Sequence, residues 1–217
     1  MARRTKEESA KTRCAIIAAA REVFQRNGVS RTTMEQIADA AGVTRGAVYW
    51  HFADKTAVFY AVRDQVALPL MDRMNFELLS GKTADPLQRI ELFLGALTDA
   101  LAGCAEVQST FDIMTFKCEY VDEFRRELVE SRHVHMELLA SLTRVYKEAA
   151  RAKLLRPAMS PEIAATDTMI FLSGLVRLWL MDKSGKLVRK RVGTLIRAHV
   201  AGRRAPPVLG GFAAGRR

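Results

Sequence analysis

An all-α fold is predicted for this chain, and three features of the sequence predict it. Apolar side chains recur at intervals of three and four residues along most of the chain, which is the period of helices with one buried face. Helix-capping residues, prolines and glycines separate these segments, as at Gly42, Asp85-Pro86 and Ser160-Pro161. Strand-like alternation, internal repeats and a nucleotide-binding glycine pattern are all missing from the sequence. We therefore expect about nine helices.

The first predicted helix is long and is expected from about residue 8 to residue 27. Its apolar residues between Ile16 and Phe24 form one stripe, and Gly28 follows at the position where a left-handed glycine commonly ends a helix. This helix offers an apolar surface against which shorter helices can pack.

Two short helices are predicted to follow it. Thr33 and Gln36 fit a capping box, and Gly42 can end the helix that the box begins. Thr44 is a second N-cap, for a helix that carries Arg45 and Tyr49 on one face. Isolated helices shorter than ~12–15 residues are marginal in water, so both must pack on the first helix. Three such helices with a short turn between the last two describe a helix-turn-helix unit, whose second helix can enter the major groove of DNA.

The outward face of this unit carries side chains that suit DNA. Arg45 is expected to read a base edge, while Tyr49, His51 and Lys55 are expected to hold phosphates. The N-terminal ends of the two short helices, at Thr33 and Thr44, would add backbone N–H groups. The candidate DNA-binding residues are Thr33, Thr44, Arg45, Gly46, Tyr49, Trp50, His51 and Lys55.

The stretch TTMEQIADAAGVTRGAVYWHFADK closely resembles the DNA-binding domain of the TetR family of bacterial repressors. The opening MARRTKEESAKTRCAIIAAA, with KCEY in the middle and SGLVRLWL near the end, is most similar to the branch that represses multidrug efflux-pump operons, the AcrR and TtgR type. The resemblance extends over nearly the whole chain and is specific in the first ~60 residues and the two later motifs. It implies a repressor that binds a palindromic operator as a dimer and is released by a hydrophobic small molecule.

Three parts of the chain follow from this reading. Residues 1–53 form the DNA-binding domain, residues 54–202 form a helical ligand-binding and dimerisation domain, and residues 203–217 form a basic disordered tail. In the second part, Asp54 caps a helix in which Pro69 should introduce a kink, and that helix connects the DNA-binding domain to everything downstream. The last helix is expected at about 186–202.

The resemblance places a large, mostly apolar ligand cavity among the helices of the second part. By position its lining comprises Val66, Leu70, Ile90, Phe93, Leu94, Leu97, Phe111, Thr115, Leu138, Leu142, Met169, Leu172 and Ser173. Leu70 and Phe111 stand where relatives carry polar residues. The expected effector is therefore a bulky hydrophobic drug, dye or plant phenolic. On the residues alone, the same Met and Phe side chains are also typical core fillers.

The same resemblance assigns the homodimer interface to the last two helices. The penultimate one, at about 161–181, is apolar on more than one face and contains small residues, which is typical of a helix buried against a partner. The candidate interface residues are Leu175, Trp179, Val188, Val192 and Leu195.

The composition is compatible with a DNA-binding repressor and argues against a membrane protein or an enzyme. The formal charge is +10, although nine Lys and Arg without any acid lie in residues 186–217. Residues 169–181 are too short an apolar run to span a bilayer and the N-terminus has no signal-like core, so the chain is expected in the cytoplasm without a membrane partner. No catalytic constellation or cofactor motif is found in the sequence. His133 and His135 lie two residues apart on a helix and face different directions, so they do not form the pair that a helical metal site prefers.

Two alternatives remain open at this point. Cys14, Cys104 and Cys118 are scattered and lack zinc-site spacing, but they could make the repressor redox-responsive. A helical protein-interaction module without DNA binding is the alternative from a different class. An electrophoretic mobility shift with the DNA upstream of the chain's own gene separates the last reading from a repressor.

Overall fold

The computed structural model describes residues 2–80, 83–119 and 124–206. These residues form α1 (Ala2–Asn27), α2 (Met34–Ala41), α3 (Arg45–His51), α4 (Lys55–Leu79), α5 (Pro86–Gly103), α6 (Ala105–Asp112), α7 (Arg125–Arg151), α8 (Pro161–Met181) and α9 (Val192–Ala201), with a π-helical turn η1 (Ile113–Lys117) and a 3-10 turn η3 (Arg189–Arg191). The predicted all-α fold is confirmed.

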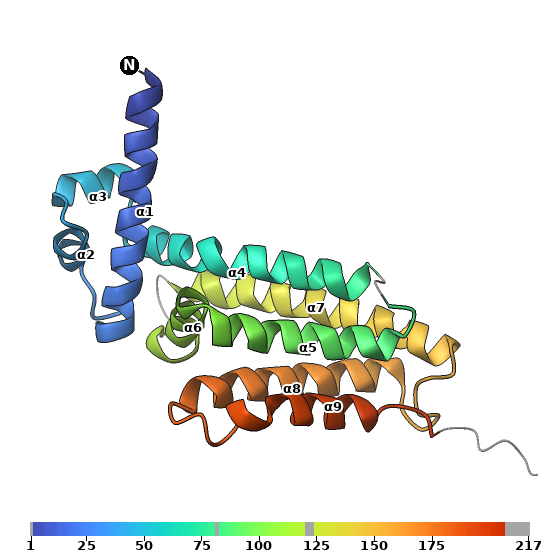
Figure 1. The fold of residues 1–217 in the computed structure, drawn as a ribbon. Helices are drawn as coiled ribbons and strands as arrows, with labels where there is room; N and C mark the ends of the chain where they lie inside the picture. Colours follow the sequence, from blue (N-terminus) through green and yellow to red (C-terminus); the bar gives the residue numbers. More distant parts are fainter. Residues whose placement is uncertain (1, 81–82, 120–123, 207–217) are drawn as a thin grey trace, which may run out of the picture.

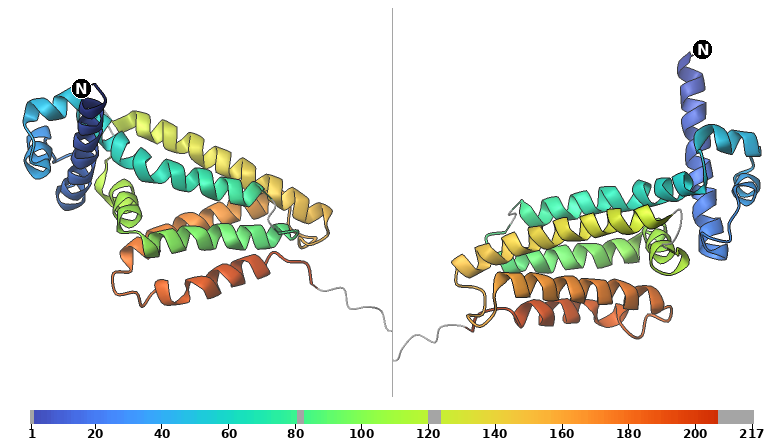
Figure 2. Two further views of the ribbon diagram at one scale, coloured as in Figure 1. Left: turned by 45° about the horizontal axis from the view of Figure 1, so that its top comes forward. Right: turned by 180° about the vertical axis from the view of Figure 1, so that it is seen from behind.

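The helices form a small N-terminal group and a larger bundle (Figure 1). The helices α1, α2 and α3 lie together at one end, and α4 runs from them into the bundle, where α4, α5, α7, α8 and α9 lie side by side (Figures 1 and 2). The short α6 lies at the junction, close to α1. The arrangement places one connecting helix and one short helix between the two groups.

The helix ends follow the local rules that the sequence predicts. Both hydrogen bonds of the capping box at Thr33 are formed, with Gln36 N–H donating to the Thr33 hydroxyl over 3.2 Å and Thr33 N–H donating to the Gln36 side chain over 3.0 Å. Gly42 then ends α2 at φ 66°. Asp85 and Ser160 cap α5 and α8, each with proline in the first turn. The order of helices thus comes from short-range sequence signals.

The last helix begins later than the sequence predicts. Residues 186–188 are not α-helical and η3 follows them, so α9 starts only at Val192. The cause is Asp182, whose carboxylate accepts hydrogen bonds from the N–H groups of Leu187 (3.0 Å), Val188 (2.8 Å) and Arg189 (3.1 Å). These donors, Val188 first, hold the pKa of the Asp182 carboxyl well below its usual range.

Residues 203–205 belong to the fold, although the sequence predicts that they begin a disordered tail. Arg203 is buried, pairs with Asp167, and accepts a backbone hydrogen bond from Arg156 over 2.8 Å. Ala205 N–H donates to the Leu154 carbonyl over 2.7 Å, and Arg204 pairs with Asp85. Two ion pairs and two backbone hydrogen bonds thus fix this segment. Residues 207–217 lie outside the described part of the chain.

Two separate clusters of buried side chains form the cores. One fills the bundle, and the other lies between α1, α2, α3 and the first turns of α4. The second cluster also includes Ile113 of η1 and Phe124, which come from the later part of the sequence. The expected boundary at residue 53 therefore separates α3 from α4, but it does not bound the core of the N-terminal group, because α4 and η1 contribute buried side chains to that core.

The helix α8 is long and apolar enough to cross a membrane by length and composition alone, and it extends beyond the apolar run expected at 169–181. In the fold it packs along α7, and its inner residues, such as Ala164, Leu172 and Trp179, are buried. A core helix of a soluble protein has the same properties. Its outer face carries exposed apolar side chains, which are Ile163, Ile170, Leu178 and Met181.

Candidate nucleic-acid interface

The helix α3 presents one face to solvent and one to the core. Val48 is fully buried, while Arg45, Gly46, Tyr49 and Trp50 are exposed. Trp50 is the most exposed large apolar side chain among the described residues, at 73%. An aromatic side chain that is kept out of the core next to an arginine is typical of a surface that binds another molecule. The predicted separation of the faces is confirmed.

Arg45 is held by two neighbours on this face. Its guanidinium pairs with the carboxylate of Glu35 on α2 and lies 5.4 Å from the centre of the Tyr49 ring. The interactions with Tyr49 and Glu35 raise the pKa of Arg45. The pair is exposed on both sides, so solvent screens it and Arg45 can exchange Glu35 for another acceptor at small cost. Glu35, ten residues before Arg45, is not among the site residues that the sequence predicts.

His51 is the last residue of α3. Its ring meets that of Trp50 edge to face, with 4.6 Å between the ring centres. Burial, and then the charge of Arg13 on α1, lower the pKa of His51. The imidazole is therefore neutral at pH 7, and it can contact a phosphate as a hydrogen-bond donor rather than as a cation. Arg13 itself lies over the ring of Phe52, 5.1 Å from its centre.

Lys55 is less available than the sequence suggests. Its ammonium donates to the Ser30 carbonyl over 3.0 Å and lies 5.9 Å from the centre of the Phe124 ring. Thr33 and Thr44 use their hydroxyls as caps, accepting from Gln36 N–H and Ala47 N–H. Lys55 thus joins the start of α4 to the loop before α2, while both threonines fix the ends of the short helices. The structure brings all eight candidate DNA-binding residues to the same end of the molecule.

A joint connects this N-terminal group to the bundle. Val29 N–H donates to the carbonyl of Lys117 in η1 over 2.8 Å. The buried guanidinium of Arg21 on α1 donates to the Gln65 side chain on α4 over 2.8 Å and lies 3.3 Å from the Glu106 carboxylate on α6. A displacement of α4 or α6 therefore acts on α1 directly. We call these contacts the α1 joint.

The predicted ligand-binding residues are packed together in the bundle core. Ile90, Leu94 and Leu142 are fully buried, and the other apolar members are buried in the same cluster or packed against it. Thr115 is half-buried in η1. Ser173 is an exception, because it is exposed on the outer face of α8, one residue further round the helix than Leu172. The structure therefore does not bring Ser173 together with the other predicted ligand-binding residues.

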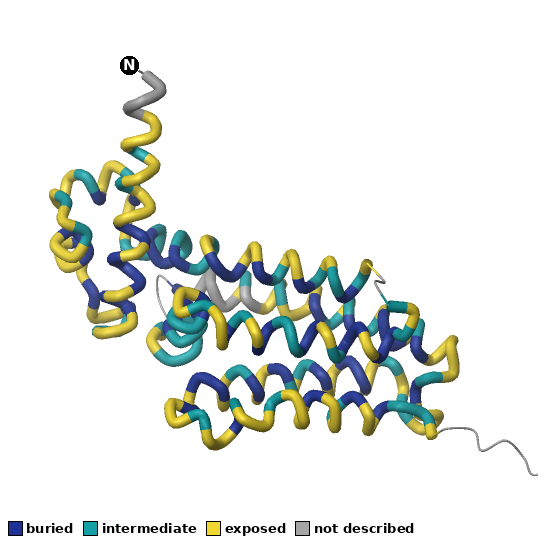
Figure 3. The backbone as a smooth tube through the Cα atoms, viewed as in Figure 1, coloured by how far each residue is buried: buried dark blue, intermediate teal, exposed yellow. Residues whose placement is uncertain are grey.

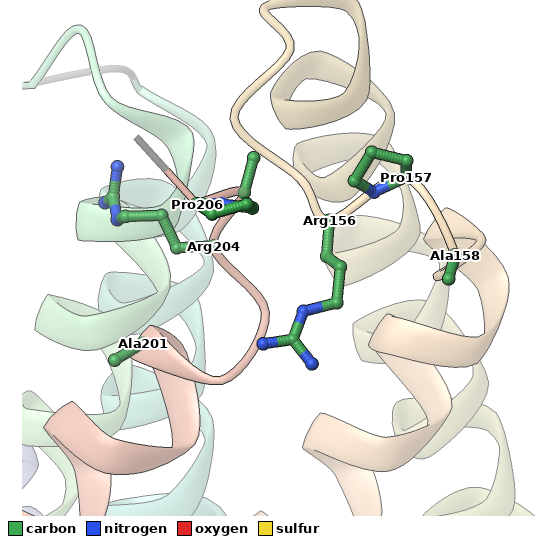
Figure 4. Close-up of a pocket in the computed structure, with 7 residues that line it drawn as sticks. Arg156, Pro157, Ala158, Ala201, Arg204 and Pro206 are labelled. Atoms are coloured by element: carbon green, nitrogen blue, oxygen red, sulfur yellow. The ribbon is translucent and has the colours of Figure 1, made fainter. Parts of the chain in front are cut away.

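The hollows of the molecule lie elsewhere. One of about 640 Å³ is lined by Arg156, Pro157 and Ala158 after α7, and by Ala201, Arg204, Ala205 and Pro206 at the end of α9 (Figure 4). A second, of about 580 Å³, borders the same segments. Neither includes a predicted ligand-binding residue.

The candidate dimer residues divide into buried and exposed ones. Leu175, Trp179 and Val188 are buried within the single chain, whereas Val192 is half-buried and Leu195 is 40% exposed. The exposed apolar residues of α8 lie at other positions round that helix than the buried Leu175 and Trp179. The helices α8 and α9 meet where the ring of Phe171 stacks on that of His199. We call the exposed apolar side chains of α8, of α9 and of the segment between them the α8–α9 face: Ile163, Ile170, Leu178, Met181, Leu187 and Leu195.

Other kinds of site find little support in the described ranges of the chain. No group of three His, Cys, Asp or Glu side chains there could hold a metal ion. Cys14 is exposed, Cys104 and Cys118 are half-buried, and no disulfide joins them.

Comparisons with known proteins agree with this geometry. The family model of bacterial regulatory proteins of the tetR family matches residues 16–62, and that of the C-terminal region of MAATS-type transcriptional repressors matches residues 85–201. The chain belongs to the TetR family of transcriptional repressors. Its match to transcriptional regulators over both parts also shows that it is not an enzyme.

Relatives of this TetR-family chain include repressors of efflux systems. The regulator TtgR of Pseudomonas putida is 33% identical over 181 residues, which is 83% of this chain and 86% of the relative. The probable acrEF/envCD operon repressor of Escherichia coli (strain K12) is 33% identical over 200 residues, 90% of this chain and 88% of the relative. NalD, the secondary repressor of the MexAB-OprM multidrug efflux pump in Pseudomonas aeruginosa, has the same fold with a TM-score of 0.78 and 32% identity, covering 92% of this chain and 99% of NalD.

Proposed function

We propose that this TetR-family repressor controls an operon for a multidrug efflux pump, binding a palindromic operator as a homodimer and leaving it when a hydrophobic small molecule binds. The exposed face of α3, with Arg45 paired to Glu35 and stacked on Tyr49, is the observation that carries the DNA-binding half of this proposal. The efflux half rests on the likeness to NalD, a repressor of a multidrug efflux pump. A DNA-binding regulator acts in the cytoplasm.

Dimerisation follows from the number of contacts that one α3 can make. A helix of seven residues reaches only a few base pairs, so operator affinity requires two copies at half-sites ~34–36 Å apart or a multiple of that distance. The α8–α9 face is the proposed contact surface, because its exposed apolar side chains lie on adjoining elements. A closed two-fold dimer would bury this surface on both copies.

Ligand release is proposed to act through the α1 joint. An effector is proposed to enter between the buried side chains of α4, α5, α7 and α8 and to push these helices apart. Movement of α4 shifts Gln65, and movement of α6 shifts Glu106, and both hold Arg21. The free energy of DNA binding can then be weakened by no more than the difference between the ligand's binding free energies for the displaced and undisplaced arrangements.

A DNA-binding experiment tests the proposal. Fluorescence anisotropy is followed with a labelled duplex from upstream of the chain's own gene and with a scrambled duplex of equal length. We expect preference for the upstream duplex, and release when hydrophobic drugs, dyes or plant phenolics are titrated in. Binding of the same compounds to the DNA-free protein is read from the fluorescence of Trp179, with Trp50 replaced by Phe so that one tryptophan remains.

The alternatives give different results in the same assay. If peroxide releases the DNA from the wild type but not from a Cys104→Ser or Cys118→Ser variant, and no compound does, the redox-responsive repressor replaces the ligand-responsive one. If neither duplex binds at moderate salt, the protein-interaction module is the better reading.

A further inference from the structure

The first turns of α1 extend beyond the rest of the N-terminal group. The first buried residue of this helix is Ile16, and the side chains described from Lys6 to Ala15 are exposed or half-buried. Figures 1 and 3 show the start of α1 extending beyond α2, α3 and the bundle. At 1.5 Å per residue, residues 2–15 form a projection about 20 Å long.

None of the side chains described from Lys6 to Ala15 is buried. An isolated helix of this length is marginal in water, so the core of the chain gives this projection little support. Its composition indicates the charge of a partner, since residues 2–15 contain five Lys and Arg against two Glu. It contains no apolar side chain larger than that of Cys14, so it lacks the apolar face with which helices enter membranes or protein grooves. An extended anionic polymer fits it best.

The orientation of the projection relative to α3 is set by Arg13. The Arg13 guanidinium lies over Phe52 at the end of α3, and its charge reaches His51. Lys6 lies seven residues earlier, which is two turns, so it occupies the same side of α1 about 10 Å further from the bundle. Lys11 lies five residues from Lys6, about 140° round the helix, and so points to another side.

We propose that this projection lies along the phosphate backbone of the DNA flanking the half-site that α3 occupies, with Lys6 and Arg13 as phosphate contacts. The inference rests on the proposed DNA-binding function and adds a second contact element to it. The contact reads no base, so it contributes affinity and salt dependence but no sequence preference.

Lys6→Ala in the full-length protein is the direct test, and Lys11→Ala is its matched control with the same charge change on the same helix. Both side chains are exposed, so neither change should affect thermal unfolding. Binding to the upstream and scrambled duplexes is measured over a range of salt concentrations. In Lys6→Ala, the negative slope of log K against log salt should become shallower by about 0.9 for each lost phosphate contact. The two copies in a dimer should therefore give a change of about 1.8. Lys11→Ala and Lys6→Arg should keep the wild-type slope.

The length of the duplex provides a second readout. Shortening the upstream duplex from both ends, until only the base pairs read by α3 remain, should weaken the wild type and abolish its difference from Lys6→Ala. Equal slopes for Lys6→Ala and the wild type overturn the inference, and so do equal losses in Lys6→Ala and Lys11→Ala, which would show a bulk charge effect. Equal binding of both duplexes by the wild type contradicts the proposed specific function instead, while the comparison of Lys6→Ala with Lys11→Ala still decides the backbone contact.

Discussion

Replacing Arg45 by alanine should remove most of the sequence preference of this repressor. Arg45 is exposed at the first position of α3, and no core contact depends on it. The change leaves the caps at Thr44 and Asp54 in place, so α3 should keep its position. The expected effect is therefore on DNA recognition and not on folding.

The magnitude follows from two opposing effects. A good contact from arginine to a base edge discriminates by ~1–3 kcal/mol, which is about 5-fold to 150-fold per half-site. Against this, Arg45 must first leave Glu35, and an exposed ion pair of this kind contributes at most about 5-fold. A mid-range base contact of ~2 kcal/mol is about 30-fold, and subtracting the full effect of leaving Glu35 leaves about 6-fold per half-site, so with two half-sites Arg45→Ala should lower affinity for the upstream duplex by about 35-fold. Glu35→Gln, which frees Arg45 and removes a negative charge near the DNA, should leave affinity unchanged or raise it by up to about 5-fold per half-site.

The assay is anisotropy at one fixed salt concentration with the upstream and scrambled duplexes, for the wild type, Arg45→Ala, Glu35→Gln and the double variant. In Arg45→Ala the ratio of the two affinities should approach one. If that ratio stays at the wild-type value, Arg45 does not read a base. If Glu35→Gln weakens binding as much as Arg45→Ala does, the carboxylate orients Arg45 for recognition and does not compete with the DNA.

Three further predictions concern the dimer, acid stability and the α1 joint. Leu178→Glu, on the α8–α9 face, should give monomers in sedimentation, whereas Leu68→Glu on α4, also 44% exposed, should not; a dimeric Leu178→Glu would exclude this face. Burial, and then Arg203, lower the pKa of His199 to about 4 from 6.5, so the unfolded state takes up a proton first and stability falls as pH drops from about 6.5 to about 4, by at most about 1.4 kcal/mol per pH unit. Urea titrations across this range should show a weaker pH dependence in His199→Gln, and an equal dependence would assign it to other groups. Gly28→Ala, at φ 81° beside the Lys117 carbonyl, should cost about 1–2 kcal/mol of unfolding free energy in the same titrations, and no loss would mean that the turn relaxes.

Helix ends and the faces of α3 could be predicted because they depend on neighbours within four residues. The capping box at Thr33, the left-handed Gly42 and the proline starts of α5 and α8 are all of this kind. The start of α9 could not, because Asp182 gathers backbone donors five to seven residues ahead of it. A periodic pattern alone does not reveal that a carboxylate has bound those donors.

Contacts between distant segments required the tertiary structure. Glu35 reaches Arg45 across the turn, and Arg21 joins Gln65 to Glu106 across three helices, although none of these pairs has a sequence signature. The apolar pattern of α8 is the clearest example. It has large apolar side chains around most of its circumference, so the sequence marks the helix as buried without stating which side meets the chain's own core.

The sequence by itself determined the helical class, the helix-turn-helix unit and its outward side chains, since these depend on local periodicity and caps. Only the tertiary structure decided that Leu175 and Trp179 belong to the core while Leu178 and Met181 face outward, and that the predicted ligand-binding residues are packed against one another. The physical reason is that burial is a property of the whole packing arrangement. Each helix turns its apolar sides toward whichever neighbours arrive from distant parts of the chain.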